Sequence, residues 1–150
     1  MIASRKILLR WLSWYGFVNG LISAVIGIRY LFFYSFPTEL SAISYVPLAL
    51  ITHFISLNYL PMVLLMMPIA ILIPNKRFIF CLSIILMASI NTLLIFDTNF
   101  FAENKYHLSL LTSVLFDQRT YMLLALQFLI VLIFEFVLAQ QLFMRINNPD

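Results

Sequence analysis

The chain has 150 residues, of which 63% are hydrophobic, 16% aromatic and only 10% charged, and its net charge is +3. Soluble domains carry about 25% charged residues, so this chain lacks the polar surface that a folded protein needs in water. Its many aromatic residues exclude intrinsic disorder. The few basic residues lie in short clusters between apolar runs, which is typical of a membrane protein and not of a nucleic-acid-binding one.

Four apolar stretches are long enough to cross a bilayer core of about 30 Å as helices. They cover residues 11–36, 47–73, 78–96 and 121–143. Pro61 and Pro68 lie inside the second stretch and should bend it, because proline removes a backbone donor from a helix. The sequence therefore predicts one all-α domain over residues 1–150, a polytopic membrane bundle of four transmembrane helices.

The segment between the third and fourth stretches, residues 97–120, is polar at both ends and apolar over residues 107–116. Ten residues are too few to cross the membrane. Leu108, Leu111 and Leu115 follow helical spacing, so we expect a short helix that lies in the membrane interface.

The distribution of Lys and Arg predicts the orientation of the bundle. Six basic residues flank the spans on one side: Arg5, Lys6, Arg10, Lys76, Arg77 and Arg145. Only Lys105 and Arg119 lie on the opposite side. Because basic residues stay in the cytoplasm, both termini are expected to be cytoplasmic.

Small residues form one face of the first span. Gly16, Gly20, Ser23 and Gly27 follow one another at steps of three or four positions, and such faces let helix backbones approach closely in lipid. Packing against the third or fourth span is the favoured interpretation. Contact with a helix of another protein is the alternative.

Three polar residues are expected at a similar depth near the outer ends of the spans: Arg29, His53 and Asp97. A charge inside the membrane usually has a partner or a function. An ion pair between Arg29 and Asp97 that fixes helix packing is favoured, a site for an anionic lipid headgroup is the second hypothesis, and a proton relay is the third.

Two further polar residues, Gln127 and Glu135, lie within the fourth span. For Glu135 we favour an internal hydrogen bond to Asn91 or Thr92, and a protonated carboxyl or a contact with a partner helix stays open. His53 and His107 are too few and too far apart to predict a metal site. No set of Ser, His and Asp predicts catalysis, and we expect no cofactor.

Several short motifs recur in the same order as in a known family. They are Asn19, Ser23, residues 26–32, 37–38, 44–46, 53–54, 82–83 and 92–94, Asp97, residues 107–108 and Glu135. In these motifs the chain resembles the N-terminal membrane part of the YejM family, also called PbgA or LapC, of the inner membrane of Gram-negative bacteria.

The resemblance implies a role beyond the residues themselves. The family has five membrane helices followed by a periplasmic domain of the sulfatase type. It helps to control lipopolysaccharide synthesis by sensing lipopolysaccharide and acting on the LapB and FtsH system that degrades LpxC, and it has been linked to cardiolipin. This sequence stops after the fourth expected span, so we expect a module without the fifth helix, the periplasmic domain or hydrolase activity.

Together these observations predict a non-catalytic module of the bacterial inner membrane that acts through lipid and partner-helix contacts. The expected partners are membrane lipids, among them lipopolysaccharide or cardiolipin, and a LapB-like membrane protein, with no nucleic acid. A small transporter or channel subunit is the alternative, because Arg29, His53 and Glu135 could mark a pathway. Against that alternative, the spans contain too few polar residues to line a continuous path.

Overall fold

The computed structural model describes residues 2–33, 38–73, 75–109 and 116–147. Over these residues the protein is helical and contains no strand. Its elements are α1 (Ile2–Gly27), the 3₁₀ helix η1 (Ile28–Phe33), α2 (Leu40–Pro61), the π-helix η2 (Met62–Met66), α3 (Met67–Leu72), α4 (Lys76–Asn104) and α6 (Gln118–Asn147). They form four helical segments long and apolar enough to cross a membrane, which confirms the all-α fold class.

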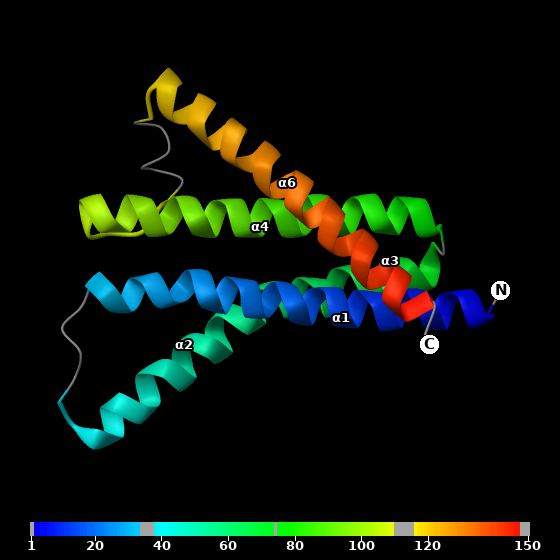
Figure 1. Ribbon diagram of the computed structural model, residues 1–150, viewed down its shortest axis with the longest axis horizontal. Helices are drawn as coiled ribbons and strands as arrows, with labels where there is room; N and C mark the ends of the chain where they lie inside the picture. The colour runs from blue at the N-terminus through cyan, green and yellow to red at the C-terminus, as the bar shows by residue number, and fades with distance from the viewer. Residues whose placement is uncertain (1, 34–37, 74, 110–115, 148–150) are drawn as a thin grey trace.

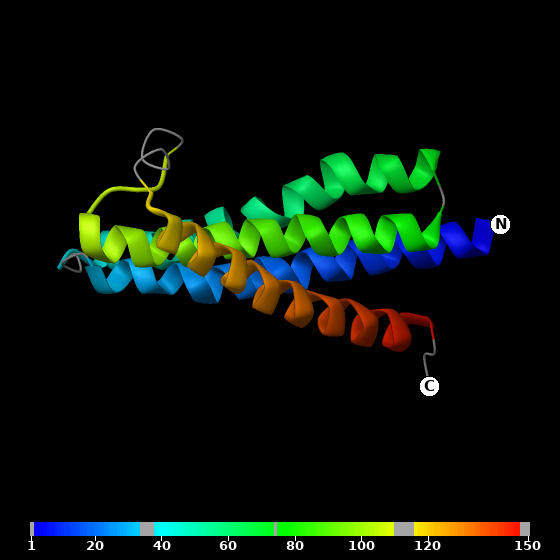
Figure 2. The same ribbon diagram turned by 90° about the horizontal axis from the view of Figure 1, so that it is seen from above.

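Successive segments run in opposite directions along the bundle (Figure 1). α1 and α4 lie side by side at the centre, and α2 packs most extensively on α1 while α6 packs mainly on α4. The start of α1, the turn between α3 and α4, and the end of α6 lie at one end of the bundle (Figures 1 and 2). At the opposite end, α2 and α6 diverge from the central pair. We call the first the basic end, because the six clustered cations belong to it, and the second the open end.

The second segment changes direction near its middle, as expected from its prolines (Figure 1). The π-helix η2 follows Pro61 directly, and Pro68 lies in the first turn of α3. Pro61 has no backbone N–H, so it cannot continue the regular α-helical ladder. A π turn is one way in which a helix absorbs such an interruption.

The helices are longer than the apolar stretches from which the spans were predicted. α4 has 29 residues and continues past Asp97 to Asn104, where Lys105 with a φ of 64° ends it. A helix of that length measures about 44 Å, more than the bilayer core. The expected interfacial helix over residues 107–116 is not confirmed, because residues 107–109 are not helical and residues 110–115 lie outside the described residues.

Two apolar clusters form the core. The one at the basic end surrounds Trp11, which stacks on Tyr15 and Phe80 and donates from Nε1 to the Ala139 carbonyl oxygen at 3.1 Å. The one toward the open end surrounds Tyr30 and Phe54. Polar side chains occupy the level between the two clusters, and they form the site described next.

Candidate functional site

A buried group of polar side chains, which we call the central polar network, connects all four helical segments. Its members are Tyr15, Asn19 and Ser23 of α1, Asn58 of α2, Asn91 of α4 and Glu135 of α6, and none is more than 1% exposed. In lipid, hydrogen bonds between helices contribute to their association because no water is available to hydrogen-bond the buried polar groups. The network therefore fixes how the four segments lie against one another.

Glu135 is the centre of this network. Its Oε2 accepts hydrogen bonds from the Tyr15 hydroxyl at 2.6 Å and from Asn19 Nδ2 at 3.1 Å, and its Oε1 accepts one from Asn91 Nδ2 at 2.9 Å. We expected Asn91 or Thr92 as the partner, and the structure brings Asn91 together with two residues of α1. Both carboxyl oxygens of Glu135 are therefore hydrogen-bonded within the bundle.

The remaining hydrogen bonds extend the network to α2. Asn91 Nδ2 also donates to Asn19 Oδ1 at 2.7 Å, and the Ser23 hydroxyl donates to Asn91 Oδ1 at 2.7 Å. Asn58 Nδ2 donates to the Ser23 hydroxyl and to the Asn19 carbonyl oxygen at 3.3 Å. Asn58 Oδ1 is buried and has no hydrogen-bond partner.

Tyr15, Asn19 and Asn58 were not predicted as members of the site, and Asn91 was expected only as a partner for Glu135. A sequence signal did exist, because asparagines are costly inside membrane spans and usually find partners on other helices. Gln127, the other polar residue predicted in the fourth span, lies outside the network. Its Nε2 donates to the Thr92 carbonyl oxygen of α4 at 2.9 Å.

The small face of α1 lies against α2, whereas the third or fourth span was expected. A Cβ atom added at Gly20 would lie 3.1 Å from the Ile55 Cα atom, and one added at Gly16 would lie 2.9 Å from Cγ of Met62. At Gly27 the nearest ring atoms of Phe54 would be only 2.2 Å away. The glycines therefore let α1 and α2 approach closely, while Ser23 on the same face joins the central polar network.

A second polar group, which we call the outer polar cluster, lies toward the open end. Asp97 accepts hydrogen bonds from the Tyr30 hydroxyl, from the Leu108 amide at 2.5 Å and from His107 Nδ1 at 2.8 Å. The His107 ring stacks on Phe101 with centroids 4.7 Å apart. Asp97 therefore holds the segment after α4 back against α4 and η1.

Arg29 does not form the expected ion pair with Asp97. The ion-pair partner of Asp97 is His107, while the exposed Arg29 donates to Thr98 Oγ1 at 3.4 Å. The reason is the 3₁₀ geometry of η1, because a 3₁₀ turn contains fewer residues than an α-helical turn. This geometry directs Tyr30, and not Arg29, toward Asp97. His53 is exposed and lines a cavity of about 700 Å³ together with Asp97 and His107.

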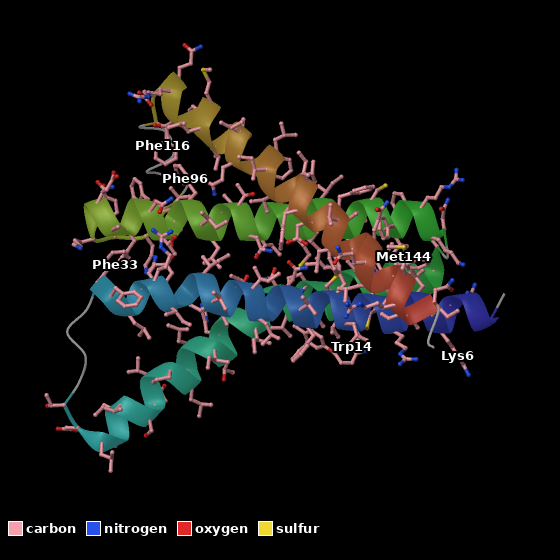
Figure 3. All side chains as sticks on the ribbon, viewed as in Figure 1. Lys6, Trp14, Phe33, Phe96, Phe116 and Met144 are labelled. Atoms are coloured by element: carbon pink, nitrogen blue, oxygen red, sulfur yellow. The ribbon has the colours of Figure 1, made fainter. Side chains whose placement is uncertain are left out.

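Aromatic side chains pack between α4 and the start of α6 at the open end. Phe116 packs against Phe96 with ring centroids 5.5 Å apart, and both lie in the gap between the two helices (Figure 3). The described residues contain no group of three or more His, Cys, Asp or Glu side chains that could hold a metal ion.

The fold and the site define a polytopic membrane domain in which buried polar residues fix the packing of the helices. The chain belongs to the family described as "Domain of unknown function (DUF3413)", which matches residues 1–148. This membership confirms the resemblance to the N-terminal region of the YejM family.

Relatives with sequence identity above 30% support the same assignment. The chain is 31% identical over 99 residues to the inner membrane protein YejM of Salmonella typhimurium and equally to that of Salmonella typhi, an alignment that covers 66% of this chain and 17% of each relative. It is 36% identical over 107 residues to an uncharacterized protein of Haemophilus influenzae, with 71% of this chain and 18% of the relative covered. The chain thus spans less than a fifth of the length of these curated relatives.

Proposed function

We propose that this chain is a non-catalytic module of the bacterial inner membrane that contributes to the control of lipopolysaccharide synthesis through contacts with lipids and with partner helices. Its similarity to YejM, which is named as an inner membrane protein, is the observation that carries the proposal. A LapB-like membrane protein is the expected partner, and lipopolysaccharide or cardiolipin the expected lipid.

The exposed apolar surface supports contacts of this kind. α2 and α6 diverge from the central pair at the open end (Figure 1) and expose large apolar side chains there, among them Leu40, Leu48, Leu123, Leu126 and Ile130. Apolar surface on a membrane helix faces lipid acyl chains or another helix.

Arg29 and His53 support a headgroup contact at the open end. Both are exposed, and the hydrogen bond that Arg29 forms with the described residue Thr98 is long, at 3.4 Å. A guanidinium can bind a phosphate with two parallel hydrogen bonds. The open end is periplasmic in this proposal, because the six clustered cations belong to the basic end and basic residues stay in the cytoplasm.

A transporter or channel is less well supported. The centre of the bundle is filled by direct hydrogen bonds between the side chains of the central polar network, with Glu135 fully buried. A permeation pathway would need polar groups that face a water-filled space.

Depletion of the chain in the bacterium that carries it tests the proposal. We expect the lipopolysaccharide content of the cells to change and to return when the wild-type chain is supplied again. A tagged chain purified in mild detergent should retain a membrane protein partner and an anionic lipid. Unchanged lipopolysaccharide content after depletion would contradict the proposed role.

A further inference from the structure

At the basic end, the helices line an open cavity of about 560 Å³ with largely apolar walls. The walls come from three helices: Leu8 of α1, Phe80 and Cys81 of α4, and Phe143, Met144 and the polar Gln140 of α6. Figure 3 labels Lys6 and Met144 at this end of the molecule. The volume is within the range of about 300 to 1,000 Å³ that small-molecule sites occupy.

Two cations line the same cavity. Lys76 and Arg77 begin α4, are exposed, and form no ion pair with any described residue. Arg5 lies one turn of α1 before Leu8, and its Nε atom is buried without a hydrogen-bond partner. Residues three positions apart share a helix face, so Arg5 lies on the face of α1 that Leu8 presents to the cavity.

Acidic side chains are missing from this end over the described part of the chain. Glu135 is enclosed in the central polar network and Asp97 in the outer polar cluster. Glu39, Glu103 and Asp117 lie at the start of α2, the end of α4 and the start of α6, all at the open end (Figure 1). Over the described residues the cavity therefore combines largely apolar walls with positive charge that no described acidic side chain compensates.

We propose that this cavity binds one anionic phospholipid, with an acyl chain between α1, α4 and α6 and its phosphate against Lys76 and Arg77. A cation near the membrane surface attracts anionic lipid, and the apolar walls select a lipid over a free phosphate. The site lies at the opposite end from Arg29 and His53. It extends the lipid contacts of the proposed function, but does not depend on a role in lipopolysaccharide synthesis.

Lipid retention by the purified chain tests the site. The chain is purified in mild detergent with either phosphatidylglycerol or phosphatidylcholine of identical acyl chains, and bound lipid is counted by native mass spectrometry. We expect about tenfold preferential retention of phosphatidylglycerol, as two cations near a lipid surface can provide. The paired variant Lys76→Gln with Arg77→Gln should lose this preference, while Lys105→Gln with Arg119→Gln, which removes the same charge at the open end, should keep it.

Cys81, the chain's only cysteine, reports on the cavity directly. Phosphatidylglycerol should slow its reaction with N-ethylmaleimide in the wild-type chain, whereas inorganic phosphate added with phosphatidylcholine should not. Equal retention of the two lipids, or equal loss of preference in both paired variants, would overturn the proposal. If the Lys76 and Arg77 variant does not fold, equal Cys81 labelling in the two lipids would still refute it. None of these measurements depends on lipopolysaccharide in cells, so the two proposals can fail separately.

Discussion

The Tyr15 hydroxyl donates a 2.6 Å hydrogen bond to the Glu135 carboxylate and so joins the first helix to the last across 120 positions of the chain. Both side chains are fully buried. Asn19 and Asn91 complete the set of donors around the same carboxylate. A change in the packing of α1 on α6 would therefore break this hydrogen bond, and water could not reach the buried groups to replace it.

Tyr15→Phe should lower the thermal stability of the chain in detergent. The variant keeps the stacking on Trp11 but leaves the carboxylate with one donor fewer, at a cost of about 1 kcal/mol. Tyr45→Phe is the matched control, because Tyr45 is 69% exposed on α2. Equal melting temperatures for the two variants would remove Glu135 as the centre of the network.

Gly20→Leu should prevent the close approach of α1 to α2. The added side chain would start 3.1 Å from the backbone of Ile55, and backbone cannot move aside as a flexible side chain can. Overpacking of this kind costs about 1–3 kcal/mol. Val25→Leu on the exposed side of α1 should leave the folded fraction unchanged in size-exclusion chromatography, and a similar loss in both variants would contradict close packing at Gly20.

Substitutions of Arg29 and of Asp97 should affect different properties, lipid retention for Arg29 and thermal stability for Asp97. Arg29→Ala should leave thermal stability unchanged and lower the amount of co-purifying anionic lipid, because its guanidinium is exposed and unpaired with Asp97. Arg29→Lys should restore only part of that lipid, since an ammonium cannot bind phosphate in a bidentate way.

Asp97→Asn should instead lower stability, because an amide cannot accept all the hydrogen bonds from Tyr30, His107 and Leu108. Loss of stability in Arg29→Ala, or stability unchanged in Asp97→Asn, would reverse these assignments.

Asp117 should make the start of α6 sensitive to acid. Its Oδ1 accepts hydrogen bonds from the Thr120 hydroxyl at 2.5 Å and the Thr120 amide at 2.8 Å, and these hydrogen bonds hold the pKa of the carboxyl below its usual value. A lowered pKa means that the ionised form stabilises the fold above the unfolded-state pKa, and that this contribution disappears as the pH falls through the folded-state pKa.

The measurement compares the melting temperatures of Asp117→Ala and the wild-type chain from neutral to acidic pH. The wild type should be the more stable at neutral pH, and the difference should shrink on acidification. Glu39→Ala is the control, because Glu39 precedes α2 without a side-chain hydrogen bond to that helix. A difference that does not change with pH would contradict a role for the ionised carboxylate.

Reporter fusions test the orientation. A reporter that is active only in the cytoplasm should give a signal when fused after Asp150 and none when fused after Glu103. The expectation rests on the distribution of Lys and Arg, with six at the basic end and only Lys105 and Arg119 at the open end, because basic residues stay in the cytoplasm. The opposite pattern of signals would invert the bundle in the membrane.

The number and type of helices could be predicted because apolar length alone specifies a membrane span. An internal hydrogen bond between Glu135 and Asn91 or Thr92 could be predicted because a carboxyl group inside a span usually has a partner, and Asn91 is a partner in the structure. Tyr15 and Asn58 could not be placed beside Glu135, because their convergence depends on the rotation of each helix. Arg29 was paired with Asp97 under regular α-helical spacing, and the 3₁₀ helix η1 places Tyr30 there instead.

The π-helix η2 affects which side chains of the second segment point toward α1. Its buried residues recur at every fourth position from Phe54 through Asn58, Met62 and Met66 to Ala70. In an unbroken α-helix, steps of four advance by about 40° each around the axis, so this stripe would wind away from α1 before it reached Ala70. The wider π turn reduces that drift. Deleting one residue within η2 would therefore rotate the buried residues on one side of the deletion away from α1 and toward lipid. The deletion would do so without altering any of the side chains that form the stripe.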